Sequence, residues 1–371
     1  MRVVAVRCLP SFLPLHSPFV TALRRTETVE SLLVEVETSA GVIGVGESPQ
    51  VWQVTGESVA SAMACVDQML APVVVGRSIA DWPSLSDEVQ RVVARNFGAK
   101  AAVETALCDL AAQAAGVTLA DLLSGAVVSG LPSGPGPDPR GVGVSEVSSG
   151  RNREVATDVT VSAAPPGEMA ASALARLAAG FTHFKLKVGA DPALDLARIA
   201  AVRDAVGPCP IRVDANQAWS RDDAVSAITT FYDAGLDLEF VEQPVRDDDV
   251  EGLAWVRARV PIPIVADESV YTLRDLDRVI DLDAADGVNV KLAKCGGPRQ
   301  AVAILRRVRE AGLETMVGSM MEGPVGVAAA ANVALAGGTT LVNDLDAAWW
   351  LAEPACGGRL RYQSGRVILG P

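Results

Sequence analysis

The spacing of apolar and polar residues divides the chain into two regions of different character. Residues 1–50 contain three runs in which apolar and polar positions alternate, MRVVAVRCL, SLLVEVET and VIGVGES, with a turn at Gly41 before the last run. Alternation with a period of two predicts half-buried β-strands. Residues 57–123 repeat apolar positions at intervals of three and four, most clearly in AKAAVETALCDLAAQAAG, which predicts helices. Strands followed by helices indicate an α+β domain over residues 1–124.

A regular alternation of strands and helices begins at residue 158. The predicted strands are DVTVS, HFKLKVG, PIRVDAN, LEFVEQP, PIVADES, GVNVKLA, ETMVGSM and TLVNDLD. Repeated βα units predict a parallel sheet, and this number of strands fits a closed barrel over residues 158–346. The alternative, an open Rossmann-type sheet, should carry a G-x-G-x-x-G turn after its first strand, and the sequence has none there.

Two segments fit neither pattern. Residues 125–157 are rich in Gly, Pro and Ser for most of their length. They offer too little apolar surface to offset the entropy of ordering, so we predict a loop or linker. Residues 347–371 end in LRYQSGRVIL, which predicts a hairpin. We expect this C-terminal segment to return to the N-terminal domain.

Acidic residues stand at the ends of three consecutive predicted barrel strands. Asp214 lies in RVDAN, Glu242 in FVEQP and Asp267 in VADES, each about one βα unit after the last. The C-terminal ends of barrel strands share one face and carry the chemistry, so we expect the three carboxylates to lie together. Such an oxygen-rich set suits Mg²⁺. The alternative is that each acid caps a helix or carries a solvated loop charge.

Lysines flank these acids on the neighbouring strands. Lys185 and Lys187 alternate along FKLKVG and so share one face, and Lys291 lies in the apolar run GVNVKLA. A lysine base needs a lowered pKa, and a neighbouring cation or metal disfavours the ammonium form. Two lysines facing each other across a metal-bound carboxylate have the geometry for inverting a carbon centre. The alternative is that they are surface lysines with buried stems.

Composition and charge narrow the classes of function. The formal net charge is −13, whereas nucleic-acid binding needs a basic face, so we expect no such partner. The sequence has no long uncharged apolar run and no signal-peptide pattern, so we expect no membrane span. The six cysteines are scattered without a C-x-x-C pair, which predicts reduced thiols in the cytoplasm. We also expect a homo-oligomer that acts on a small molecule.

The motifs at the strand ends together resemble those of one known family. The motifs are K-x-K, D-x-N, V-E-Q-P, A-D-E-S and N-x-K-x-x-K-x-G-G. This set is similar to that of the muconate-lactonizing-enzyme subgroup of the enolase superfamily, and the resemblance covers the chain except residues 125–153. It implies an α/β fold in which a (β/α)₇β modified TIM barrel carries an N-terminal α+β capping domain. It also implies a magnesium-dependent isomerase.

The resemblance implies a role for each of the charged strand ends. The magnesium ligands correspond to Asp214, Glu242 and Asp267, the two acid/base catalysts to Lys187 and Lys291, and the residue that tunes Lys187 to Lys185. Asn216 and Glu268 match positions whose side chains orient the ligands and lysines.

Two further features narrow the reaction. The mandelate-racemase branch of the superfamily uses a histidine late in the barrel, and neither His16 nor His183 lies there. The eighth predicted strand ends in the D-x-D motif of Asp344 and Asp346, with which dipeptide epimerases bind the free α-ammonium group of the substrate. The segment PFVTALRRTETVES is similar to the specificity loop of L-Ala-D/L-Glu epimerases, where an arginine at the position of Arg24 pairs with an acidic side chain.

The resemblance therefore predicts a dipeptide epimerase that inverts the α-carbon of the C-terminal residue, with an L-Ala-L/D-Glu-like substrate. An N-acylamino acid racemase and a muconate-type cycloisomerase are the alternatives within the subgroup, and D-x-D disfavours both. Trp349 and Trp350 follow D-x-D where smaller aliphatic residues are commoner, and we expect them to reshape the pocket. A different class of protein, a non-catalytic barrel that binds a partner, should have lost a ligand or a lysine, and none is missing.

Overall fold

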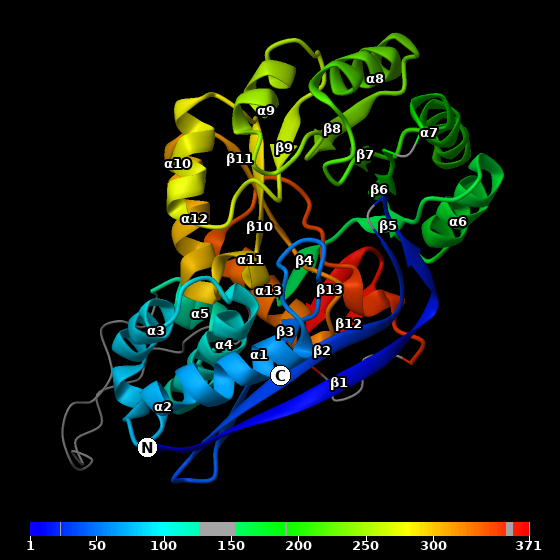
Figure 1. Ribbon diagram of the computed structural model, residues 1–371. Coiled ribbons are helices and arrows are strands. Elements are labelled where there is room, and N and C mark those ends of the chain that lie inside the picture. Colours follow the sequence, from blue (N-terminus) through cyan, green and yellow to red (C-terminus); the bar gives the residue numbers. More distant parts are fainter. Residues whose placement is uncertain (23, 126–152, 190, 354–358, 371) are drawn as a thin grey trace, which may run out of the picture.

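The chain forms a capping domain and a barrel, seen side by side in the computed structural model (Figure 1). The structure describes residues 1–22, 24–125, 153–189, 191–353 and 359–370. Most of the predicted linker, and Cys356, therefore lie outside the described residues. Among the described helices, none is long and apolar enough to cross a membrane.

The capping domain begins with an antiparallel sheet of three strands, as the alternating pattern predicts. Its strands are β1 (Val3–Val20), β2 (Arg25–Thr38) and β3 (Ile43–Pro49), in the order β1-β2-β3. Gly41 makes the predicted turn with a φ of 75°. The helical elements that follow are α1 (Val59–Cys65), η1 (Val66–Leu70), α2 (Ala71–Val74), η2 (Ile79–Asp81), α3 (Trp82–Arg91), α4 (Phe97–Ala115) and α5 (Leu119–Leu123).

Helix α4 forms the core of the capping domain, because its small residues let it pack closely against β3. A Cβ atom at Gly46 would lie 1.9 Å from the carbonyl oxygen of Ala102, so only glycine permits this approach. Leu32, Val34 and Val36 of β2 are fully buried in the same cluster. The Ala-rich sequence of α4 is thus explained by packing on the sheet.

The second region is a parallel barrel. Among the described residues, seven parallel strands pair in chain order: β5 (Val159–Val161), β6 (Phe184–Lys187), β7 (Ile211–Asp214), β8 (Leu238–Glu242), β9 (Ile264–Ala266), β10 (Gly287–Lys291) and β11 (Glu314–Gly318). Parallel bridges from Asn343 to Thr157 and from Asp344 to Gly318 join the two edges of this sheet, so the eighth strand closes the barrel.

The barrel helices surround these strands (Figure 1). They are α6 (Pro166–Ala178), α7 (Pro192–Val206), α8 (Arg221–Asp233), α9 (Val250–Arg257), α10 (Leu273–Asp281), α11 (Leu292–Cys295), α12 (Pro298–Glu310) and α13 (Pro324–Gly337). On β6, Phe184 and Leu186 belong to the apolar cluster while Lys185 and Lys187 alternate with them. Side chains of a strand alternate between two faces, so the apolar residues pack on the helices and the lysines point into the barrel.

Three details differ from the sequence prediction. The eighth predicted strand, TLVNDLD, is present only as the two bridges at Asn343 and Asp344, whose side chains accept hydrogen bonds from Val317 and Lys185 on other strands. Residues assigned to the linker include a strand, β4 (Glu154–Ala156). The terminal hairpin, β12 (Leu360–Gln363) and β13 (Arg366–Leu369), adds to β4 and not to the capping sheet. The C-terminal segment meets the capping sheet earlier, where Leu351 bridges to Leu15 of β1.

The capping domain is fastened to the barrel by a buried acid. Both carboxylate oxygens of Glu47 on β3 accept hydrogen bonds from α13, at 2.7 Å from the backbone N–H of Gly323 and at 2.9 Å from that of Gly326. These N–H groups at a helix start have no partner within the helix. The end of β1 is tied to the barrel as well, since the N–H of Ala163 donates to the carbonyl of Val20 at 3.2 Å. The end of β1 therefore lies over the mouth of the barrel.

Candidate active site

The charged residues predicted at the strand ends converge at the C-terminal mouth of the barrel. They are Lys185 and Lys187 on β6, Asp214 on β7, Glu242 on β8, Asp267 directly after β9, and Lys291 on β10. The register pairs Lys187 with Asp214, and Asp214 with Glu242. Neighbouring strands thus present their last residues side by side, as a βα barrel requires.

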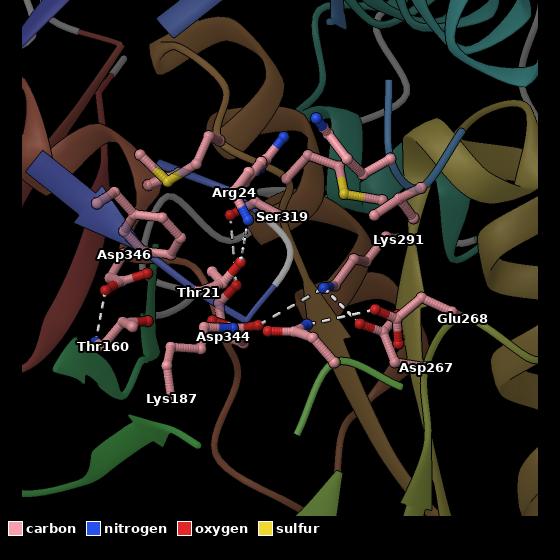
Figure 2. A pocket seen from close by; sticks show the side chains of 17 residues that line it. Thr21, Arg24, Thr160, Lys187, Asp267, Glu268, Lys291, Ser319, Asp344 and Asp346 are labelled. Carbon is pink, nitrogen blue, oxygen red and sulfur yellow. Dashed lines mark hydrogen bonds and ion pairs between the residues drawn. The ribbon is translucent and has the colours of Figure 1, made fainter. Parts of the chain in front are cut away.

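A cavity opens at this mouth, and both domains contribute to its wall (Figure 2). The predicted residues that line it are Lys187, Lys291, Asp267, Asn216, Glu268, Asp344, Asp346 and Arg24. The capping domain supplies Phe19 and Thr21 beside Arg24, and the barrel supplies Thr160 and Ser319. The other three predicted residues, Lys185, Asp214 and Glu242, lie beneath the cavity and are fully buried.

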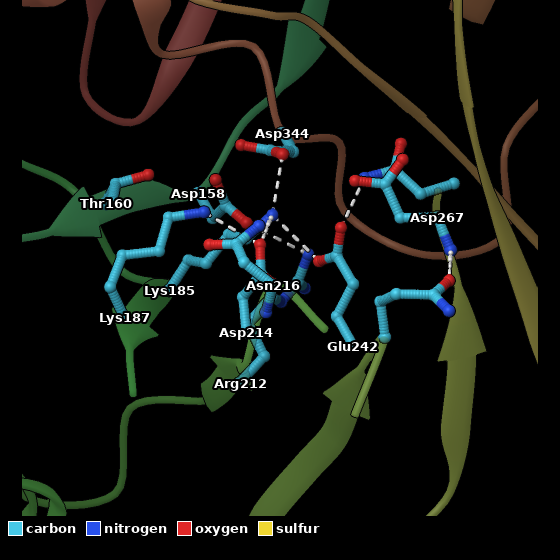
Figure 3. A network of polar contacts seen from close by, with 12 residues as sticks. Asp158, Thr160, Lys185, Lys187, Arg212, Asp214, Asn216, Glu242, Asp267 and Asp344 are labelled. Atoms are coloured by element: carbon cyan, nitrogen blue, oxygen red, sulfur yellow. Dashed lines mark hydrogen bonds and ion pairs between the residues drawn. The ribbon is translucent and has the colours of Figure 1, made fainter. Parts of the chain in front are cut away.

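Lys185 stands at the centre of the buried acids (Figure 3). Its Nζ lies 2.9 Å from Asp214 Oδ2, 2.8 Å from Glu242 Oε2 and 2.8 Å from Asp344 Oδ2. Burial lowers the pKa of Lys185, but the surrounding carboxylates outweigh burial and raise that pKa well above its usual value. The charge of Lys185 is thus balanced by three carboxylates.

Lys187 and Lys291 approach the cavity from opposite sides of the acidic strands. Lys187 Nζ lies 2.7 Å from Asp214 Oδ2, and Lys291 Nζ lies 2.7 Å from Asp267 Oδ2. Lys291 is also 3.8 Å from Asp344 Oδ2. Burial lowers the pKa of Lys291, but the negative charges around it, that of Asp267 above all, raise this pKa above its ordinary value.

The charge balance around Glu242 and Glu268 fits a bound cation. Burial raises the pKa of Glu242 to about 7, and burial with the charge of Asp267 raises that of Glu268 to about 8. Glu268 Oε2 is buried and accepts no hydrogen bond within the described residues, whereas Glu242 Oε2 and Asp267 Oδ1 each lie against a lysine Nζ. Carboxylate oxygens are the ligands that Mg²⁺ prefers, so Asp214, Glu242 and Asp267 fit this ion.

A second group of acids lies close by. Oxygen atoms of Asp158, Asp344 and Asp346 fall within 4.8 Å of one another, and all three residues are buried. Asp158 pairs with Arg212 at 3.2 Å, however, and Asp344 pairs with Lys185. Lysines engage Asp214, Glu242 and Asp267 as well, so the assignment of the metal to that set rests on their shared place at neighbouring strand ends and stays a prediction.

Two residues of the site were not singled out from the sequence. Asn289 on β10 donates from Nδ2 to Glu242 Oε1 at 2.9 Å. Lys294 Nζ lies 2.5 Å from Asp267 Oδ1 and donates to the backbone carbonyl of Asn289 at 3.2 Å. Both belong to the N-x-K-x-x-K motif, and Asn289 shares a strand face with Lys291 through its i, i+2 spacing. That spacing was the available signal.

The predicted orienting residues contact each other. Asn216 donates from Nδ2 to Glu268 Oε1 at 3.3 Å, and both line the cavity. Asn216 has a φ of 44°, a conformation in which asparagine is enriched among residues with a side chain. Its backbone N–H donates to Asp214 Oδ1 at 2.9 Å.

The remaining predicted residues, Arg24 and Asp346, differ in the contacts that their side chains make. Arg24 is half-buried at the cavity wall, and its guanidinium makes no ion pair within the described residues. Burial lowers the pKa of Arg24 to about 10. Asp346 Oδ2 accepts hydrogen bonds from the backbone N–H of Thr160 at 2.7 Å and from the indole N–H of Trp350 at 2.9 Å. Among the described residues, the cavity thus has a cation without an ion-pair partner on the capping side and acids on the barrel side.

Comparison with known proteins places the chain in a family. Residues 3–124 match the mandelate racemase / muconate lactonizing enzyme N-terminal domain, and residues 168–370 match the enolase C-terminal domain-like family. The chain therefore belongs to this family of capped barrels, and the predicted family and fold are confirmed.

Individual members of the family resemble the chain over its full length. The L-Ala-D/L-Glu epimerase of Bacillus subtilis (strain 168) is 37% identical over 373 residues, which cover 100% of this chain and 95% of that protein. The solved structure of a substrate-liganded complex of the L-Ala-D/L-Glu epimerase from B. subtilis superimposes with a TM-score of 0.90 at 36% identity, covering 100% and 96% of the two chains. A dipeptide epimerase from Enterococcus faecalis V583, complexed with Mg and the dipeptide L-Leu-L-Tyr, has a TM-score of 0.88 at 32% identity, covering 100% and 98%.

Proposed function

We propose that the protein is a magnesium-dependent dipeptide epimerase that inverts the α-carbon of the C-terminal residue of its substrate. The observation that carries the proposal is that Asp344 and Asp346 line the same cavity as Lys187 and Lys291. A substrate that meets both pairs must present a cation to the acids and a carbon acid to the lysines. A dipeptide with a free N-terminus has both groups.

In the proposed reaction, two lysines act on opposite faces of one carbon. Lys187 removes the α-proton from one epimer, and Lys291 delivers a proton to the other face; the roles reverse for the other epimer. Lys185 remains charged beneath Lys187. Mg²⁺ held by Asp214, Glu242 and Asp267 would draw electron density from the substrate carboxylate and so acidify the α-C–H bond.

The alternatives within the family predict different substrates. An N-acylamino acid carries no cation, and a dicarboxylate for cycloisomerisation would be repelled by Asp344 and Asp346. A non-catalytic barrel would have no reason to keep both lysines and all three acids. Turnover of N-acetylated amino acids in preference to every dipeptide would replace this proposal with an N-acylamino acid racemase.

The most direct test is to incubate a library of dipeptides with the protein and Mg²⁺ in D₂O. Epimerisation exchanges the α-proton with solvent, so each substrate gains mass and is identified by mass spectrometry. We expect L-Ala-L-Glu or a dipeptide similar to it among the labelled compounds. A library without any labelled dipeptide would contradict the proposal.

Replacement of Asp346 with Asn is expected to lower kcat/KM for a free dipeptide about ten- to a hundredfold, because a charge-assisted hydrogen bond is worth about 1.5–3 kcal/mol. Activity on the N-acetyl derivative should change little, since that derivative has no ammonium group. The ratio of kcat/KM for the free dipeptide to kcat/KM for its N-acetyl derivative should therefore fall. Asp281→Asn, on the exposed end of α10, is the control and should leave the preference intact. Equal losses on both substrates would remove Asp346 from the ammonium site.

Replacement of Arg24 with Met is expected to lower kcat/KM for X-Glu dipeptides about ten- to a hundredfold and for X-Leu dipeptides much less. The reason is that a guanidinium binds a carboxylate through two parallel hydrogen bonds, whereas Leu offers it nothing. Arg25→Met is a matched control, because Arg25 is exposed and pairs with Glu27 at 2.9 Å. If both Arg24→Met losses are equal, Arg24 does not select the second residue.

The kind of partner follows from the same proposal. The partner is a small-molecule dipeptide, and we infer no nucleic-acid or membrane partner. A cytoplasmic location and a homo-oligomeric state stay predictions from the sequence. Light scattering on the purified protein measures its oligomeric state directly.

A further inference from the structure

The tryptophans that follow the D-x-D motif make contacts that have no part in the proposed proton transfer. Trp350 ends the short helix η3 (Ala347–Trp350) and is 1% exposed. Its indole N–H reaches back one turn and donates to Asp346 Oδ2 at 2.9 Å. The backbone N–H of Thr160 donates to the same oxygen at 2.7 Å (Figure 2). Both donors bind Oδ2, and no described residue donates a hydrogen bond to Oδ1, so we take Oδ1 as the oxygen of Asp346 that is open to a ligand.

The ring of Trp350 is held in place by two aromatic residues of the capping domain. His16 of β1 stacks on it with centroids 5.4 Å apart and an interplanar angle of 8°. Phe19, which lines the cavity, meets it edge-on at 5.2 Å. Aromatic contacts of this kind favour one ring orientation. The indole N–H is therefore aimed at Asp346 before any substrate arrives.

Arg176 of α6 supports both donors to Asp346. Its guanidinium carbon lies 4.7 Å from the centre of the Trp350 ring, a cation–π contact. Its Nε donates to the carbonyl of Thr160 at 2.9 Å. The same arginine thus contacts the indole of Trp350 and the backbone of Thr160, the two residues whose N–H groups hold Asp346.

We propose that Trp350 is a positioning residue for substrate specificity, which fixes the Asp346 carboxylate so that its free oxygen receives the α-ammonium group of the dipeptide. This inference rests on the proposed function. A carboxylate held by two donors needs no reorientation when the ammonium group binds, so affinity is gained through preorganisation. An uncharged N-terminal group gains nothing from this arrangement. Trp350 therefore acts on the choice between a free and an acylated substrate and not on proton transfer.

The test compares L-Ala-L-Glu with N-propionyl-L-glutamate, which is the same molecule without the amino group. For Trp350→Phe, which keeps a ring but removes the donor, kcat/KM on the dipeptide should fall about tenfold, mainly through KM. Activity on the propionyl compound should stay within about twofold, as expected for a substrate that makes no contact with Asp346. In an Asp346→Asn background the Trp350 change should add little further loss, because its target is gone.

Trp349→Phe is the matched control. Trp349 also contacts Arg176, at 5.1 Å, but within the described part of the chain its indole N–H has no acceptor. This variant should leave the ratio of the two substrates unchanged. To separate the hydrogen bond from packing, Trp350 can be replaced by benzothienylalanine, which has the shape of tryptophan without the N–H group. The benzothienylalanine protein should show the same selective loss of kcat/KM on the dipeptide. It therefore tests the hydrogen bond even if the phenylalanine variant folds poorly.

The outcomes are distinguishable. Equal losses on the two substrates, or an unchanged ratio with benzothienylalanine, would overturn the positioning role while the epimerase proposal stands. A wild-type protein that turns over no dipeptide would overturn both. A narrowed ratio in both Trp350 variants, with an unchanged ratio in Trp349→Phe, is the expected result.

Discussion

Replacement of Lys187 or Lys291 with alanine is expected to abolish epimerisation, with kcat lowered by about a thousandfold or more. General acid–base catalysis by one positioned side chain contributes about 10²–10⁴ in rate, and inversion needs both lysines. Each epimer, however, loses its α-proton to only one of them. Each variant should therefore keep deuterium exchange for one epimer only, and the two variants should keep opposite ones.

This exchange pattern is measured by NMR or mass spectrometry on each pure epimer in D₂O. Lys100→Ala is a suitable control, because Lys100 is a buried lysine of α4 that donates to the carbonyl of Gln90 at 2.9 Å, outside the cavity. It should retain epimerisation. If Lys187→Ala or Lys291→Ala epimerises at a rate near that of the wild type, the lysine concerned is not an acid/base catalyst. Exchange of both epimers by both variants would also contradict the two-face arrangement.

Removal of divalent metal with a chelator is expected to eliminate turnover, and Mg²⁺ is expected to restore it. Buried acids dominate the floor of the site, where burial raises the pKa values of Glu242 and Glu268, and a bound cation would favour their ionised forms. Mg²⁺ should also raise the Tm, because a ligand that binds only the folded state at 100 times its Kd stabilises that state by about 2.7 kcal/mol. Full activity of the chelated protein would contradict the assignment.

The same measurement decides between the two groups of acids. Asp267→Asn should remove the increase in Tm caused by Mg²⁺, whereas Asp158→Asn should keep it. Asp158 is a suitable comparison because it is equally buried and lies in the neighbouring group with Asp344 and Asp346. The reverse result would move the ion to that group and leave Asp214, Glu242 and Asp267 as a network for the lysines.

The sequence was most informative where candidate site residues recur once in each βα unit. Asp214, Glu242 and Asp267 each follow an apolar strand at an interval of about one βα unit, and parallel strands bring their C-terminal ends to one rim. Any chain with this pattern that folds as a barrel must gather those side chains. The same reasoning could have identified Asn289, which lies two residues before Lys291 on the same strand and binds Glu242.

Polar partners that are distant in the sequence could not be predicted in this way. Glu47 binds two residues at the start of α13 that lie 276 and 279 positions later in the chain. No local sequence pattern predicts these contacts. The strand at Glu154–Ala156 is similar, because it exists only through pairing with β13 at the other end of the chain. Such contacts depend on the packing of whole elements.

The sequence by itself determined which strands carry charge at their ends, and with it the chemical character of the site, because the period of a βα barrel converts spacing into proximity. Only the tertiary structure decided how those charges are used. It placed Lys185 among three carboxylates, left Arg24 without an ion-pair partner in the described residues, and aimed the indole of Trp350 at Asp346. The reason is physical: burial makes each of these charges costly unless it is paired, and pairing is set by side chains that converge from separate strands and from the other domain.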